Sequence, residues 1–180
     1  MQMERHFVLT LCLVLLRSAI FLGSSTVVAA QESGLDGTYI LDETDSDNVN
    51  EVIDDAVGKL NFLTRDIARD RLKKLNPAYH QVVITSSPNE ISVTVDNQRP
   101  LRTPAKSAPV AWVGPDGGRV NARMQLAGRR LAQTFTSAAG RRVNDYTLSA
   151  DGRTLTMQVT ETSPRLSQPI AYKQVYRRVS

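Results

Sequence analysis

The sequence predicts a mainly β protein: an up-and-down antiparallel β-barrel of about 8–10 strands, with a helical insertion between the first two strands capping one end. Two observations predict it. From Val82 onward, apolar and polar residues alternate in short runs separated by turns such as Pro115-Asp116-Gly117-Gly118. Before these runs, apolar residues recur at helical spacing instead. Consecutive hairpins with one apolar face each leave two open sheet edges unless the sheet closes, so closure is favoured and a β-sandwich is the alternative.

The first 30 residues have the pattern of a signal peptide, and residues 31–180 are expected to form a single β-barrel domain. An apolar run, interrupted by Arg17, extends to Val28-Ala29-Ala30, where small residues suit signal-peptidase cleavage. A retained membrane anchor is the alternative. The only cysteine, Cys12, lies in this leader, so the domain has no disulfide. We therefore expect a secreted or periplasmic protein, or a membrane-anchored one if the leader is retained.

The helical insertion is expected between the first strand and the second. Apolar residues follow helical spacing from Val49 to Leu75, and Gly58 and Asn61 are weak helix formers within that range. The segment is therefore either two short helices or one kinked helix. Ser46 or Asp47 is the expected N-cap, because short polar side chains accept hydrogen bonds from the first free N–H groups of a helix.

The remaining chain is expected to form strands. The two short ones flanked by Pro100, Pro104 and Pro109 should lie at sheet edges or be distorted, because proline has no N–H to donate. The expected strands cover residues 37–41, 82–84, 91–95, 98–103, 109–113, 120–126, 131–135, 146–148, 155–159 and 170–178.

Charge is distributed unevenly. Residues 31–58 hold nine acidic residues and no basic one, whereas residues 59–180 hold twenty basic and eight acidic residues. Such asymmetry suits an anionic partner, or an acidic segment that folds back onto basic rims of the same domain. We favour the second interpretation.

Strand direction assigns the arginines to two rims of the barrel. In an up-and-down meander, the start of each strand lies level with the end of the one before it. The rim opposite the helices should carry Arg129, Arg130, Arg153, Arg177 and Arg178. The other rim should carry Arg119, Arg141, Arg142 and Arg165. A basic rim can bind phosphate-bearing partners. Because no stacking aromatics are interleaved with these arginines, we expect no nucleic-acid partner.

The second half of the insertion is a cationic amphipathic helix. Arg65, Arg69 and Lys73 lie on one flank, and an apolar face that includes Leu63 and Ile67 lies on the other. Membrane contact through the helical cap is one interpretation. A solvated charged flank is the favoured one.

No catalytic motif accompanies this pattern. The sequence has no Gly-x-Ser-x-Gly, His-Glu-x-x-His or glycine-rich phosphate loop, and His80 is the only histidine beyond the leader. Asp45, Asp47 and Asn48 suggest calcium ligands but lack the glycine and the distal glutamate of an EF-hand loop. We expect neither catalysis nor a metal or other cofactor.

Short motifs resemble a known superfamily. The opening Gly37-Thr38-Tyr39-x-Leu41, the inserted helical pair and the closing Gln174-Val175-Tyr176 resemble the calycins, in the layout of the fatty-acid-binding-protein branch. The segment Tyr146-x-Leu148-Ser-Ala-Asp151-Gly152-Arg153-Thr154-Leu155-Thr156 resembles lipocalin-like domains of secreted bacterial proteins. The resemblance implies a barrel that binds a small hydrophobic ligand in its lumen.

One binding pair can be transferred from this resemblance. Fatty-acid binders hold a carboxylate with an Arg-x-Tyr pair on the final strand, and the matching positions here are Gln174 and Tyr176. Glutamine donates a hydrogen bond but carries no charge, so a neutral or mostly apolar ligand is expected. The candidate ligand-binding residues on inward faces are Met124, Phe135, Tyr146, Met157, Tyr172, Gln174 and Tyr176.

Two functions remain open at this point. The barrel is either an exported carrier of a small hydrophobic ligand, or a filled barrel that acts as a cell-envelope interaction module through its arginine rim. A lumen on the order of several hundred cubic ångströms would favour the carrier. A filled interior would favour the interaction module. No oligomeric state follows from the sequence.

Overall fold

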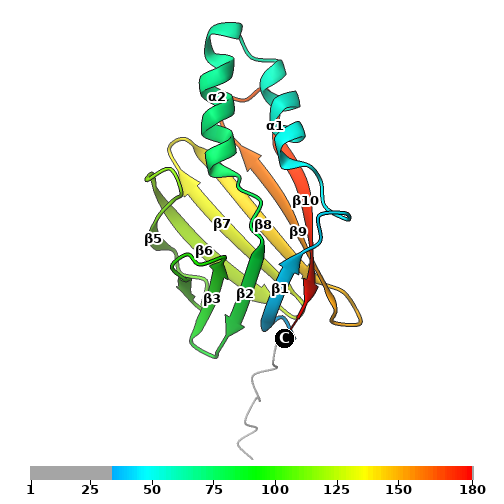
Figure 1. Cartoon of the computed structure of the whole chain (residues 1–180). Helices are drawn as coiled ribbons and strands as arrows, with labels where there is room; N and C mark the ends of the chain where they lie inside the picture. The colour runs from blue at the N-terminus through cyan, green and yellow to red at the C-terminus, as the bar shows by residue number, and fades with distance from the viewer. Residues whose placement is uncertain (1–33, 180) are drawn as a thin grey trace, which may run out of the picture.

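The computed structural model describes residues 34–179, so the leader predicted at residues 1–30 lies outside the described part of the chain. Ten antiparallel strands form one sheet in the order β4-β3-β2-β1-β10-β9-β8-β7-β6-β5, and two helices lie between β1 and β2. The sheet curls into a nearly closed barrel (Figure 1), which confirms the predicted fold class. The strands are β1 (Gly37–Leu41), β2 (Gln81–Ser86), β3 (Glu90–Val95), β4 (Leu101–Pro104), β5 (Val110–Val113), β6 (Arg119–Ala127), β7 (Arg130–Ser137), β8 (Gly140–Leu148), β9 (Thr154–Thr162) and β10 (Ile170–Arg178).

The first and last strands pair with each other. Tyr39 of β1 lies opposite Arg178 of β10, and Leu41 lies opposite Tyr176. This pairing joins the two ends of the described chain in the middle of one continuous sheet, and the curl of the sheet brings β4 close to β6. The two sheet edges that remain are β4 and β5, the proline-flanked strands, as predicted.

The interior is built from alternate residues of the strands. On β9, Leu155, Met157 and Val159 are buried, while the residues between them are exposed or half-buried. The strand register aligns one row of buried side chains across four neighbouring strands: Leu131, Tyr146, Met157 and Gln174. Burying apolar surface stabilises the fold by roughly 25 cal/mol per Å².

The insertion forms two helices, α1 (Val49–Gly58) and α2 (Phe62–Leu75), which settles the choice between two helices and one kinked helix. Asn48 is the N-cap of α1, and its side chain accepts hydrogen bonds from the backbone N–H groups of Asn50 and Glu51. The cap predicted at Ser46 or Asp47 is therefore wrong by one or two positions.

Ser46 and Asp47 have a different function. The Ser46 hydroxyl accepts a hydrogen bond from the backbone N–H of Val175 at 2.8 Å, and the Asp47 carboxylate accepts one from the N–H of Lys173 at 2.6 Å. Both side chains therefore attach the connection before α1 to β10, which positions the helices at one end of the barrel.

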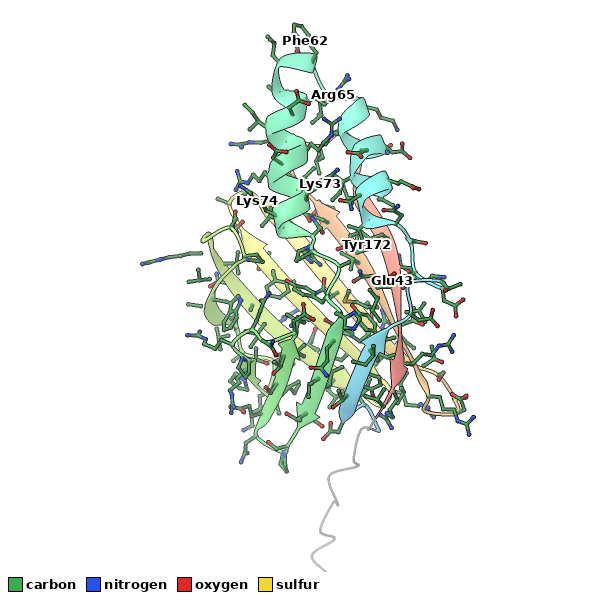
Figure 2. The ribbon with its side chains drawn as sticks, viewed as in Figure 1. Glu43, Phe62, Arg65, Lys73, Lys74 and Tyr172 are labelled. Carbon is green, nitrogen blue, oxygen red and sulfur yellow. The ribbon has the colours of Figure 1, made fainter. Side chains whose placement is uncertain are left out.

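The two helices stand side by side and project beyond the end of the barrel (Figure 1). Leu63 and Ile67 of α2 are 70% and 74% exposed, and Leu72 is the buried residue of this helix. The predicted apolar face of α2 is therefore not packed against the barrel along its length. Arg65 lies between the helices (Figure 2), where its guanidinium donates to the carbonyls of Gly58 and Leu60 and connects the two helix ends. Neither helix within residues 34–179 is long and apolar enough to cross a bilayer.

The acidic segment pairs with bases of the same domain, as favoured from the sequence. Arg177 of β10 donates to Asp42 at 2.8 Å and also contacts Asp45. Arg69 of α2 donates to Asp54 of α1 at 2.9 Å. The hydrogen bond from Arg177 lowers the pKa of the Asp42 carboxyl below its ordinary value. Of the acidic residues in this segment, Asp42, Asp45 and Asp54 are thus paired with bases inside the fold.

Candidate functional site

A cavity of about 1250 Å³ opens at the helix end of the barrel. Side chains from β3 to β9 and from α2 line it, and its walls are predominantly apolar. This volume exceeds the range of about 300–1000 Å³ typical of small-molecule pockets. The part of the interior nearest the helices is therefore not filled, which favours the carrier over the interaction module. Apolar residues of the wall include Val93, Val95, Leu101, Trp112, Val120 and Phe135.

The helix α2 lies along the mouth of this cavity and is attached on two sides. Arg71 of α2 forms an ion pair with Asp116, in the turn between β5 and β6, at 3.4 Å. At the end of α2, the carbonyl of Leu75 accepts a hydrogen bond from the Arg142 guanidinium of β8 at 2.8 Å. The exposed Ile67 faces the cavity between these attachments.

Side chains rather than backbone hydrogen bonds cover the seam between β4 and β5. The guanidinium of Arg99, just before β4, lies 4.6 Å from the ring centre of Trp112 on β5. A cation over an aromatic face is attracted by the negative potential of the ring. Both residues line the cavity and also a smaller pocket formed with residues of β4 and β5, so the pair lies between the two.

Arg142 is the centre of a polar network in the cavity wall. Its Nη1 donates to the carbonyl of Leu75 at 2.8 Å and to the Asn76 side-chain oxygen at 2.7 Å. Its Nη2 donates to the Tyr172 hydroxyl at 3.1 Å, and its Nε donates to Asn144 at 2.8 Å. Figure 2 shows Tyr172 at the helix end of the barrel. The network connects the end of α2 to two strands.

Glu161 supplies a negative charge to the same network. It lies opposite Arg142 in the pairing of β8 with β9, and its carboxylate accepts a hydrogen bond from the Asn76 side chain at 2.9 Å. Both charged residues line the cavity. The polar network around Arg142 therefore contains a negative charge as well as a positive one.

A pair of buried amides continues the network deeper along the wall. Asn144 donates from Nδ2 to the side-chain oxygen of Gln133 at 2.9 Å, and the Tyr146 hydroxyl donates to the same oxygen at 3.4 Å. The Gln133 amide nitrogen has the Met124 sulfur, at 3.9 Å, as its partner. Gln133 and Asn144 line the cavity although both are buried.

The structure distributes the predicted ligand-binding residues over two regions. Phe135 lines the cavity, whereas the other predicted residues belong to the packed interior and not to the cavity wall. The Tyr176 hydroxyl donates to the Gln174 side-chain oxygen at 3.0 Å, so the pair matched to Arg-x-Tyr is bonded to itself. A direct role of these residues in binding stays a prediction. The buried residues outside the wall are Met124, Tyr146, Met157, Tyr172, Gln174 and Tyr176.

The arginines of the predicted basic rim are largely bonded within the chain. Arg129 donates to the carbonyls of Ser149 and Ala150, and Arg130 pairs with Asp145. Arg178 contacts the carbonyl of Asp36 and the Tyr39 hydroxyl. Together with the Arg177 pairs described above, these contacts compete with any anionic partner of the rim. No side-chain contact of this kind is described for Arg153.

The residues considered as calcium ligands have structural partners. Asp45 contacts Arg177, Asp47 accepts from β10, and Asn48 caps α1. Within residues 34–179, no group of three or more histidine, cysteine, aspartate or glutamate side chains is arranged to hold a metal ion.

Gln133 and Asn144 are the residues of the site that the sequence interpretation missed, and the central position of Arg142 in the polar network was not foreseen either. Arg142 was assigned to the helix-side rim with Arg119, Arg141 and Arg165, and all four line the cavity. A usable signal existed, because the period of two on β7 and β8 places Gln133 on the inward face with Phe135, and Asn144 on that face with Tyr146.

Comparisons with known proteins support the fold. A scan against protein-family models and a search of curated proteins gave no match. Solved structures do match. A Schistosoma mansoni fatty acid binding protein in complex with arachidonic acid has a TM-score of 0.53 and 19% identity, over 83% of this chain and 98% of that chain. Caenorhabditis elegans lipid binding protein 8 has a TM-score of 0.52 and 12% identity, over 81% and 96%.

The fluorescent protein UnaG also matches, with a TM-score of 0.53 and 16% identity over 80% of this chain and 96% of that chain. At these identities the likeness establishes the fold alone. The barrel thus has the architecture of fatty-acid-binding proteins, in agreement with the layout that the sequence motifs predicted.

Proposed function

We propose that this protein is a non-catalytic carrier that binds a small hydrophobic molecule in the cavity at the helix end of its barrel. The single observation that carries the proposal is the cavity of about 1250 Å³ with predominantly apolar walls. Replacement of water by an apolar ligand in an apolar cavity of this size lowers the free energy of the system. The fatty-acid-binding architecture of its structural neighbours supports the same function. The leader pattern of residues 1–30 supports export of the carrier.

Trp112 provides an internal reporter of binding. It is the only tryptophan of the chain, and it lines the cavity. Titration with dodecan-1-ol is expected to shift its emission to shorter wavelengths, because the ligand replaces water around the ring. The shift should saturate at one site per chain. An unchanged emission spectrum, together with no retention of the alcohol in equilibrium dialysis, would contradict the proposal.

Two substitutions on β3 locate the site. Val95 lines the cavity, and Thr94 faces the other side of the same strand. Val95→Phe reduces the cavity volume and is expected to weaken dodecan-1-ol binding at least tenfold (roughly 1.4 kcal/mol). Thr94→Phe adds the same ring outside the lumen and should leave binding within about twofold of the wild type.

We also propose that the tip of the helical pair contacts an anionic membrane. Phe62 and Leu63 are 73% and 70% exposed, and Figure 2 shows Phe62 at the far end of the pair. Residues 59–75 contain six basic and two acidic residues, a surplus that favours an anionic surface. Exposed large apolar side chains beside cations are typical of segments that enter the interface of a bilayer.

Vesicle co-sedimentation tests this contact. Phe62→Ser combined with Leu63→Ser is expected to weaken binding to phosphatidylglycerol-containing vesicles at least about tenfold, because two apolar side chains no longer enter the bilayer. Val179→Ser removes an exposed apolar residue that lies beside Thr38 of β1, away from the helical pair, and is the control. Equal sedimentation of the double variant and the wild type would disprove the contact.

A further inference from the structure

We infer that Gln133 recognises an uncharged hydrogen-bond acceptor, a carbonyl or a hydroxyl oxygen, on the ligand. This inference rests on the proposed carrier function and names the chemical class of its ligand. It starts from an unusual residue: a glutamine that is only 4% exposed but lies in the wall of a mostly apolar cavity.

The orientation of the Gln133 amide is fixed by its neighbours. The Arg142 guanidinium can only donate hydrogen bonds, so the side-chain oxygen of Asn144 must face it. The Asn144 amide nitrogen then faces Gln133, which must present its own oxygen to Asn144. The hydrogen bonds from Arg142 to Asn144 and from Asn144 to Gln133 thus leave the Gln133 amide nitrogen pointing away from the network.

That nitrogen is poorly satisfied by the protein. An amide nitrogen carries two N–H donors, and the described partner here is the Met124 sulfur at 3.9 Å, a weak acceptor. Leaving a buried donor without a strong partner is unfavourable. The Gln133 oxygen is in the opposite situation, since it accepts from both Asn144 and Tyr146. The unmet hydrogen-bonding capacity in this part of the wall is therefore that of a donor, which calls for a ligand acceptor.

The lining of the whole cavity has six arginines and two acidic residues, but the charged groups of the network beside Gln133 are already paired, which favours a neutral acceptor at this position. The Arg142 guanidinium is already engaged by four acceptors, and Glu161 lies opposite it on the neighbouring strand. A carboxylate placed beside Gln133 would lose its hydration and gain only amide dipoles in return. A ketone, ester, amide or alcohol oxygen loses much less hydration and can accept the same hydrogen bond. The apolar remainder of such a ligand would lie against residues such as Phe135 and Val95.

The test compares three probes of one chain length by the emission of Trp112: dodecan-2-one, dodecanoate and dodecane. The wild type is expected to bind dodecan-2-one at least tenfold more tightly than dodecanoate. Gln133→Met should weaken dodecan-2-one about tenfold and leave dodecane unchanged or tighter. Gln133→Glu keeps the oxygen that Asn144 and Tyr146 require and loses the donor when its carboxyl is ionised, so weaker dodecan-2-one binding at high pH than at low pH tests the lost donor if the methionine variant does not fold.

Two further variants complete the test. Gln125→Met changes an exposed glutamine on β6 and should keep the wild-type selectivity. Gln174→Met examines the rival position on β10, and loss of dodecan-2-one binding there, with Gln133→Met unaffected, would overturn the inference. Equal affinity of the wild type for the ketone and the carboxylate would also overturn it while leaving the carrier function intact. Failure of the wild type to bind any of the three probes would remove the carrier function itself.

Discussion

Replacing Arg142 by methionine is expected to lower the free energy of unfolding by about 3 kcal/mol. The guanidinium donates four hydrogen bonds, which connect the end of α2 to β8 and β10. Methionine fills much of the same volume but donates nothing, so the carbonyl of Leu75 and the side-chain oxygen of Asn144 lose their partner, whereas the Asn76 oxygen keeps the Tyr172 hydroxyl at 2.9 Å. The cost of buried groups left without partners is larger than the net value of each hydrogen bond.

Urea or thermal unfolding measures this effect, with Arg141→Met as the matched control. Arg141 is the next residue on β8 and is exposed, and no side-chain hydrogen bond is described for it. Its replacement should change stability by less than about 0.5 kcal/mol. For a domain of this size the Arg142 variant should melt about 10 °C below the wild type. Equal stability of the two variants would show that the network does not hold α2 to the barrel.

Raising the pH above about 10 is expected to destabilise the barrel steeply. Tyr146, Tyr172 and Tyr176 are fully buried, and this burial raises the pKa of each phenol above its ordinary value of 10.0. The folded protein keeps these three protons at a pH at which the unfolded chain releases them. Their stabilisation is therefore complete below pH 10 and is lost as the pH rises toward the folded pKa values. The slope is about 1.4 kcal/mol per pH unit for each phenol, or about 4 kcal/mol per pH unit for the three.

Phenolate absorbance and far-ultraviolet circular dichroism, recorded during the same alkaline titration, measure this transition. Phenolate should appear in the step in which β-structure is lost. Tyr146→Phe should reduce the slope of stability against pH by about 1.4 kcal/mol per pH unit, because one titrating group is removed. Phenolate formation with a midpoint near pH 10 in a protein that remains folded would contradict the burial of these residues.

The sequence was sufficient to predict the number and order of the strands, because the period of two is a local property, although β8 extends over Gly140–Leu148 and not only over the expected residues 146–148. It identifies the inward faces of β6 to β9, and the proline-flanked segments lie at the sheet edges as expected. The cap at Asn48 was missed because Ser46, Asp47 and Asn48 are all good N-caps, and the choice among them depends on contacts with β10. That contact joins residues more than a hundred positions apart in the sequence.

The site was less predictable than the strands, because it also depends on contacts between residues that are distant in the sequence. Arg142 is the third residue of β8, so strand direction correctly places it near the helix end, but only the position of α2 turns it into the centre of a network. The exposed Leu63 and Ile67 follow the same principle, because helical spacing reveals an apolar face without revealing what covers it. The cavity itself depends on how side chains from eight elements leave space between them, and no local pattern carries that information.

Isothermal titration calorimetry of the wild type with dodecan-1-ol at several temperatures tests the existence of a binding lumen most directly. Transfer of an alkyl chain into an apolar cavity should give one site per chain and a negative heat-capacity change. Val95→Phe should diminish both the affinity and the heat-capacity change, whereas Thr94→Phe should preserve them. A heat-capacity change near zero, or binding that is indifferent to Val95→Phe, would place the alcohol outside the barrel and contradict the account.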